Sequence, residues 1–233
     1  MNAKTVFTRF MLTVFCGMLF VAGGLPSAWT QADQSSEESP MSETYSPSEL
    51  QAMREAFISE FERSPLNTTP GDAQFLRILI ESAGCQRGIE VGTATGFGAV
   101  NMGMAFEQTG GHLYTIDIDP QMVESARDNI SEMALEETVT VIEGDALEVL
   151  PQMEGKFDFL FIDAVKQDYF KYFKSIARRL KPGSIIVADN VIRFEEEMKD
   201  FLDFMKEDPD YLMQVIVCSE EKGDGMAVIY KAR

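Results

Sequence analysis

Histidine and cysteine are scarce in this chain of 233 residues, and their scarcity excludes several kinds of catalytic site. His112 is the single histidine, so a zinc site built on histidines and a Ser-His-Asp triad both lack residues that they require. The three cysteines, Cys16, Cys85 and Cys218, are too few for a disulfide scaffold. We interpret Cys85 and Cys218 as small buried hydrophobic residues.

Positive charge is also in short supply. The chain carries 20 Lys and Arg residues against 38 Asp and Glu residues, which gives a formal net charge of −18. The one close basic cluster, Arg178, Arg179 and Lys181, falls at an expected helix end, where it offsets the helix dipole. An anionic surface repels phosphate backbones, so the sequence predicts no nucleic-acid partner.

The first 32 residues differ from the rest of the chain. Lys4 and Arg9 precede an apolar run at 10–22, and proline and small residues follow it, which is the layout of an export signal. We expect residues 1–32 to be a signal peptide, or an uncleaved membrane anchor, and the Ser-, Glu- and Pro-rich residues 33–48 to be a flexible linker. The protein would then be exported or anchored, with membrane contact only through this segment. If translation begins at Met41, the protein would be cytoplasmic instead.

Residues 49–233 are expected to form one α/β domain. Buried-looking strands alternate with amphipathic helices, which predicts a doubly wound, mostly parallel sheet with helices on both faces. Asp72 is expected to cap an early helix, and Gly223-Asp224-Gly225 predicts a tight turn that ends the sheet in an antiparallel hairpin. Strands are expected at 88–91, 112–117, 138–142, 157–162, 184–189, 212–218 and 226–231, and helices at 95–106, 120–133, 146–153, 168–180 and 194–207.

A glycine-rich turn at residues 88–98 follows the first of these strands. Gly92 permits a sharp turn and a close approach of the backbone to a ligand, and a helix beginning near Thr95 would aim free amides at it. Asp117, at the tip of the next strand, can accept both hydroxyls of a ribose. Asp145 and the backbone of Ala146 are placed to meet an adenine edge, although Asp145 is equally suited to capping a helix.

The turn alone does not distinguish a nicotinamide cofactor from S-adenosylmethionine. Its spacing is E-x-G-x-x-x-G rather than G-x-G-x-x-G. Glu90 also brings an acid toward the loop, where it would repel a pyrophosphate but favour an ammonium or sulfonium group. Both features favour S-adenosylmethionine.

Oxygen-bearing side chains end two later strands. Asp163 follows one strand, and Asp189 and Asn190 follow the other, so three oxygen ligands for a hard cation such as Mg²⁺ are expected to converge. Lys166 can lean over the same site as a base. Taken singly, Asp163 also suits a helix cap, Asp189-Asn190 a turn, and Lys166 a solvated surface position.

The stretch from Thr68 to Arg233 resembles the cation-dependent class I O-methyltransferases, the group that contains catechol and caffeoyl-CoA O-methyltransferases. The resemblance rests on the strings TTPGDAQFL, GIEVGTATGFGA, LYTIDIDP, EGDALEVLP, FDFLFIDAVKQDYFKYF, LKPGSIIVADNV and GDGMAVIYK. It implies a seven-stranded sheet with a reversed last strand, S-adenosylmethionine as methyl donor, and a possible homodimer. It also implies roles for individual residues: Thr69, Glu90, Gly92, Thr93, Asp117 and Ala146 as cofactor contacts, Asp163, Asp189 and Asn190 as metal ligands, and Lys166 as catalytic base.

Two departures from that family matter. Gly98 stands where relatives usually carry a serine that bonds the carboxylate of the cofactor, so this contact is lost or falls to the backbone. After Asn190 the sequence runs almost directly into the next helix, where relatives often have a longer loop that shapes the acceptor pocket.

The expected reaction is methyl transfer to a hydroxyl group of a small, catechol-like acceptor. Two other functions stay open: a non-catalytic protein that binds S-adenosylmethionine, and an NAD-dependent dehydrogenase.

Overall fold

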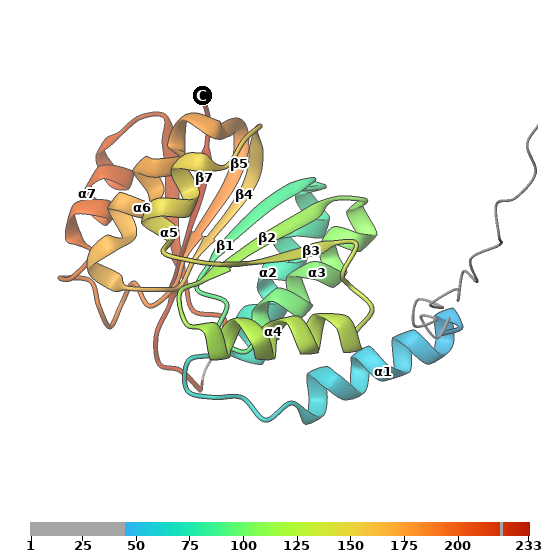
Figure 1. The fold of residues 1–233 in the computed structure, drawn as a ribbon. Helices are drawn as coiled ribbons and strands as arrows, with labels where there is room; N and C mark the ends of the chain where they lie inside the picture. The colour runs from blue at the N-terminus through green and yellow to red at the C-terminus, as the bar shows by residue number, and fades with distance from the viewer. Residues whose placement is uncertain (1–44, 220) are drawn as a thin grey trace, which may run out of the picture. The chain divides into compact units, whose positions relative to one another are not determined.

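A seven-stranded sheet with helices on both faces makes up the part of the chain that the computed structural model describes, residues 45–219 and 221–233 (Figure 1). The strand order is β3-β2-β1-β4-β5-β7-β6, and β7 runs antiparallel to both of its neighbours, β5 and β6. The predicted fold, with its reversed last strand, is confirmed. The strands are β1 (Arg87–Val91), β2 (His112–Asp117), β3 (Val139–Glu143), β4 (Phe157–Ile162), β5 (Leu180–Ala188), β6 (Tyr211–Ile216) and β7 (Met226–Lys231).

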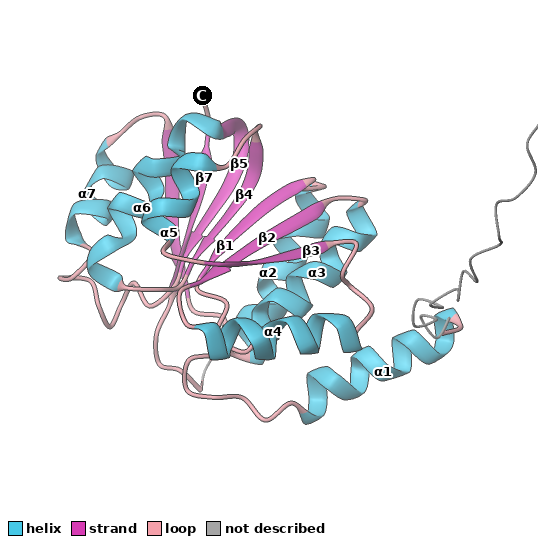
Figure 2. Ribbon diagram, in the orientation of Figure 1, coloured by secondary structure: helices cyan, strands magenta, loops and turns pink. Residues whose placement is uncertain are grey.

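The helices divide between the two faces of the sheet, as Figure 2 shows. One face is covered by α2 (Pro70–Ala83), α3 (Phe97–Thr109) and α4 (Pro120–Glu132), and the other by α5 (Ala146–Val149), α6 (Tyr169–Ile176) and α7 (Lys199–Glu207). Short 3-10 turns, η1 (Leu150–Gln152), η2 (Lys166–Asp168) and η3 (Ala177–Arg179), flank α5 and α6.

The two cores meet at the central strand β4, whose side chains alternate between the faces. Phe159 and Phe161 pack with α2 and α3, whereas Leu160 and Ile162 pack with α6 and α7. All four side chains are fully buried. From Phe159 to Ile162 the strand is a continuous apolar run, as expected of a parallel strand that is buried on both faces, and the bounds of β4 were predicted correctly from sequence.

The first helix, α1 (Pro47–Glu60), begins at a capping box in which Ser46 and Glu49 satisfy each other's backbone amides. It is held to the domain by Arg54, which is buried. The Arg54 guanidinium pairs with Glu107 at 2.6 Å and donates to the carbonyl oxygens of Met133 and Ala134 at the end of α4.

Several local predictions are wrong, among them the three that follow. Thr69, not Asp72, caps α2, because the Thr69 hydroxyl accepts the amide of Asp72 and leaves Asp72 inside the first turn. β6 ends at Ile216 rather than at residue 218, so the connection to β7 begins at residue 217 and Cys218 lies beyond the strand. The last helix begins at Lys199, not at residue 194, because turns occupy residues 191–198.

The predictions for the N-terminus fall on residues outside the structural description. The predicted signal segment at 1–32 and the linker up to residue 44 belong to that part of the chain. Among residues 45–219 and 221–233, no helix is both long enough and apolar enough to cross a membrane.

Candidate functional site

A cavity of about 720 Å³ lies at the carboxyl ends of the parallel strands. In open α/β sheets this edge is where ligands bind, and the volume suits a ligand of cofactor size. Most of the predicted site residues line it: Thr69, Gly92, Asp117, Asp145, Ala146, Asp163, Lys166 and Asn190. The topology therefore brings both predicted halves, cofactor and metal, to one cavity.

Two sets of contacts fix the backbone conformation of the glycine turn after β1. Gly92 has φ +97°, in the region that favours glycine, and a Cβ there would overlap the carbonyl oxygen of Asp163. Across the turn, one carboxylate oxygen of Asp117 accepts the backbone amides of Thr93 at 3.0 Å and Ala94 at 2.8 Å. Asp117 thus fixes the shape of the turn while its side chain also lines the cavity.

Three of the predicted cofactor contacts do not line the cavity: Glu90, Thr93 and Gly98. Glu90 is buried, and its carboxylate accepts the hydroxyl of Thr115 at 2.5 Å. Thr93 hydrogen-bonds the same hydroxyl from the other side. A Cβ at Gly98 would lie 2.8 Å from a Glu90 carboxylate oxygen, so the first turn of α3 packs directly on that carboxylate.

Burial raises the pKa of the Glu90 carboxyl to about 8; the hydrogen bond from Thr115 opposes this effect, and the carboxylates of Asp163 and Asp117 add to it. Through the Thr115 hydroxyl, Thr93 of the glycine turn is linked to the buried Glu90 carboxyl.

Two further residues of the cavity lining, Thr69 and Asp145, both cap helices. The Asp145 carboxylate accepts the amide of Leu147 at 2.8 Å, as its capping interpretation predicts, and Ala146 is the first residue of α5. Thr69 caps α2 through the amide of Asp72. At each of these helix starts the capping side chain accepts a backbone amide of the first turn.

The two strands that carry the predicted metal ligands are direct neighbours. Ile162 of β4 pairs with Ala188 of β5, so Asp163 and Asp189 leave the sheet side by side. Asp163 and Asn190 line the cavity, while Asp189 is fully buried and accepts the backbone amide of Asn190 at 2.6 Å. Burial raises the pKa of the Asp189 carboxyl, with Asp163 adding to the effect and Lys222 opposing it.

Asp224 orients the amide of Asn190, and its role was missed from sequence. It is buried and accepts the backbone amides of Ile192, Arg193 and Gly225 at 2.8–3.1 Å. Burial opposes its ionisation, but these hydrogen bonds lower its pKa below the usual value. An ionised Asp224 can only accept, so the amide nitrogen of Asn190 faces it at 3.4 Å, and the amide oxygen remains available for a cation.

Lys166 is part of a polar chain rather than a solvated surface lysine. Its ammonium donates to Asp163 at 2.7 Å and to the hydroxyl of Tyr169 at 3.0 Å, and that hydroxyl donates to the backbone carbonyl of Asp189 at 3.2 Å. Tyr169 is fully buried. A residue of the helix after β4 therefore ties Lys166 to the tip of β5.

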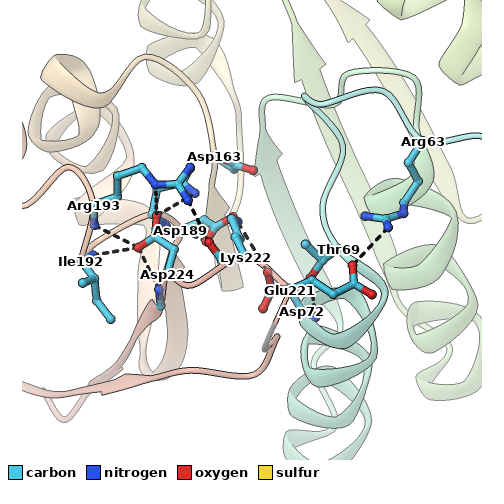
Figure 3. A network of polar contacts seen from close by, with 12 residues as sticks. Arg63, Thr69, Asp72, Asp163, Asp189, Ile192, Arg193, Glu221, Lys222 and Asp224 are labelled. Atoms are coloured by element: carbon cyan, nitrogen blue, oxygen red, sulfur yellow. Dashed lines mark hydrogen bonds and ion pairs between the residues drawn. The ribbon is translucent and has the colours of Figure 1, made fainter.

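Sequence reasoning also missed Lys222, which reaches the site from the connection between β6 and β7. Its ammonium contacts the Asp189 carboxylate and lies 3.5 Å from the Asp72 carboxylate of α2, as Figure 3 shows. The neighbouring Glu221 pairs with Arg63 at 3.4 Å. No local pattern signals these contacts, because they join residues about 30 to 160 positions apart.

The residue types at the two strand tips fit a hard divalent cation. Two carboxylates and an amide oxygen are the ligand types that Mg²⁺ prefers, and Asp224 fixes the orientation of the amide. Among the described residues, no three His, Cys, Asp or Glu side chains cluster so as to hold a metal ion by themselves. A metal at this position would therefore depend on the amide of Asn190.

Comparison with known proteins identifies similar methyltransferases. A family model described as O-methyltransferase matches residues 39–210. The catechol O-methyltransferase of Niastella koreensis is 34% identical over 140 residues, which cover 58% of this chain and 63% of that protein. The matched region thus spans less than two thirds of that relative's length.

Solved structures agree in fold. Cofactor-bound Rv0187 from MTB is 27% identical with a TM-score of 0.69, over 79% of this chain and 90% of that one. The O-methyltransferase from Bacillus cereus in complex with SAH has the same TM-score at 24% identity, over 80% and 92% of the two chains, which shows a shared fold.

Proposed function

This chain belongs to the O-methyltransferase family, and from that premise we propose that it transfers a methyl group from S-adenosylmethionine to a hydroxyl group of a small, catechol-like acceptor. The observation that carries the proposal is one cavity lined both by the glycine turn with Asp117 and by Asp163, Asn190 and Lys166. A donor and an acceptor bound in these two halves would lie next to each other, and positioning of this kind supplies much of the rate of a displacement reaction.

The cofactor half is assigned to the residues around the glycine turn. S-adenosylmethionine supplies a methyl group on a positively charged sulfur. Asp117 and Asp145 place carboxylates at the cavity wall, and Gly92 lets the backbone come close to a ligand. The similar protein Rv0187 was solved with a cofactor bound, which supports a cofactor site in this fold. For Glu90, Thr93 and Gly98, direct contact with the cofactor stays a prediction.

We assign the metal half to Asp163, Asp189 and Asn190, which would hold Mg²⁺ or a similar ion. A bound ion of this kind would lower the pKa of an acceptor hydroxyl and orient the two oxygens of a vicinal diol. The hydrogen bond from Asn190 to Asp224 turns the amide nitrogen toward Asp224 and leaves the amide oxygen to face the ion. The backbone amide of Asp163 donates to the carbonyl oxygen of Val91 at 2.9 Å, and this bond fixes the position from which the Asp163 carboxylate extends.

Lys166 is the residue we assign to proton transfer. Its nitrogen is fixed between Asp163 and Tyr169 at the edge of the cavity, within reach of a hydroxyl bound beside Asp163. In the described arrangement it is an ion-paired ammonium, so it must first lose a proton to water. The neutral amine then accepts the proton of the acceptor hydroxyl while the new carbon–oxygen bond forms and the carbon–sulfur bond breaks.

The proposal is tested by incubating the full chain with S-adenosylmethionine and a panel of catechols and single phenols, with and without EDTA. Mass spectrometry should detect methylated catechols, and EDTA should suppress them. Methylation that persists in EDTA would remove the metal from the proposal and leave the methyltransferase.

Titration calorimetry with S-adenosylhomocysteine and with NAD separates the alternatives. We expect S-adenosylhomocysteine to bind and NAD not to bind. Binding of NAD alone would point to a dehydrogenase. Binding of S-adenosylhomocysteine without methylation of any hydroxyl would point to a non-catalytic binding protein.

A further inference from the structure

The ammonium of Lys222 forms an ion pair with Asp189, one of the carboxylates that we assign to metal binding. The ammonium contacts the Oδ2 atom of Asp189, and the Oδ1 atom of the same carboxylate accepts the backbone amide of Asn190. The side chain of Asp189 is 1% exposed and that of Lys222 is 16% exposed, so water screens this ion pair little. The chain therefore brings its own cation to the proposed metal site (Figure 3).

The position of Lys222 is set by contacts on both sides of it. Asp224, two residues later, is held by the three backbone amides described above. On the other side, the carbonyl oxygen of Cys218 lies so close to α2 that a Cβ at Gly71 would be 2.8 Å from it. Residues 218 and 224, on either side of Lys222, are thus both in contact with other parts of the domain.

A second partner for the ammonium is already in place. The Asp72 carboxylate, whose side chain is 4% exposed, lies 3.5 Å from the Lys222 nitrogen. Moving the ammonium fully onto Asp72 would free Asp189 without sending a buried charge into an apolar environment. The buried Asp72 carboxylate would at the same time keep the Lys222 ammonium as its positively charged partner.

We propose that Lys222 is a built-in competitor for the divalent ion: it neutralises Asp189 when no metal is bound and must shift toward Asp72 before a metal can bind. This inference rests on the metal assignment made above. If Lys222 occupies Asp189 in nine molecules of ten, the apparent metal affinity falls about tenfold, because only the remaining molecules can bind. Lys222 would thus set the metal concentration at which the enzyme is loaded.

Two substitutions with opposite effects test the proposal on the full chain. Lys222→Met removes the competitor while keeping a side chain of similar length, and should bind Mn²⁺ about tenfold more tightly than the parent. Asp72→Asn removes the alternative partner, holds the ammonium on Asp189, and should bind Mn²⁺ more weakly. Lys206→Met, an exposed lysine paired with Glu195 at 3.8 Å, is the matched control and should bind like the parent.

Calorimetric titration of metal-free protein with Mn²⁺ gives these affinities without measuring turnover. Lys222→Met leaves two buried carboxylates without their ammonium, so its melting temperature without metal should fall and should recover when Mn²⁺ is added. Equal Mn²⁺ affinity in Lys222→Met and the parent would overturn the inference. Absence of Mn²⁺ binding in both would overturn it together with the metal assignment, while S-adenosylhomocysteine binding would still report on the methyltransferase proposal.

Discussion

Gly92 and the carbonyl oxygen of Asp163 touch so closely that no side chain fits between them. The two residues follow β1 and β4, which are neighbours in the sheet. The contact joins the cofactor half of the cavity to the metal half, so the spacing between the two halves is set by backbone rather than by flexible side chains.

Gly92→Ala should therefore damage the fold. The new methyl group would meet a backbone atom, and φ +97° is strained for alanine, so we expect a loss of roughly 3 kcal/mol in the free energy of unfolding. The matched control is Gly84→Ala, at φ +63° with open space around the Cβ position, which should cost roughly 1–2 kcal/mol. Urea denaturation measures both, and equal losses would show that the Asp163 contact is unimportant.

Glu90 should make the protein less stable as pH rises. Its pKa is raised from 4.5 to about 8 in the folded protein, so between these values the folded state holds a proton that the unfolded state has lost. The stabilisation is complete below pH 4.5 and is lost as pH approaches 8, by up to about 5 kcal/mol.

Glu90→Gln removes this titration while keeping an oxygen that can accept the Thr115 hydroxyl. The variant and the parent should have similar melting temperatures near pH 5, and the variant should become the more stable of the two near pH 8. A pH profile for Glu90→Gln that is as steep as the parent's would contradict the assignment.

Lys166→Met should reduce turnover on the order of 100-fold or more, because it removes the proposed base. Binding of S-adenosylhomocysteine should change little, because Lys166 contacts Asp163 and Tyr169 rather than the glycine turn. Lys174→Met, an exposed lysine over the ring of Phe170, is the control. Initial rates measure turnover and calorimetry measures the binding of S-adenosylhomocysteine. Turnover that survives in Lys166→Met would count against a base at residue 166.

Arg54 should contribute strongly to the attachment of α1, in addition to the packing of Met53, Phe57 and Ile58 on the core. Replacing it with methionine leaves Glu107 and two backbone carbonyl groups without their donor, so we expect a loss of roughly 2–4 kcal/mol. Arg127→Met removes an exposed arginine with a single long hydrogen bond of 3.4 Å and should change stability by less than about 0.5 kcal/mol. Thermal and urea unfolding of the two variants compare these costs directly.

Much of the fold could be predicted because its signals are local. The strands at 112–117, 157–162 and 226–231 have the predicted bounds, since each is rich in β-branched and aromatic residues and is bounded by glycine or charged residues. Boundaries failed where distant contacts decide them. The last helix begins late because Asp224 takes the amides of Ile192 and Arg193, which holds that segment in turns.

The same distinction applies to the site. Asp163, Asp189 and Asn190 could be placed together because neighbouring parallel strands end at one edge of a sheet. Strand alternation directs the Glu90 side chain to the face of the sheet that α3 covers, and its predicted contact with the cofactor stays a prediction. Lys222 and Asp224 lie on the connection to β7, and only the tertiary fold brings that connection to the cavity.

The place of β7 has a consequence for how the protein is made. The last strand in the sequence is the sixth in the sheet, so β6 has no strand to pair with until residues 226–231 have left the ribosome. A nascent chain that ends before this point already contains every residue that we assign to the cofactor or to the metal. Its strand β5, however, still lacks its pairing partner β7. Loss of residues 226–233 would remove a strand from within the sheet, whereas a cut before α2 would remove none of the strands that the structure describes.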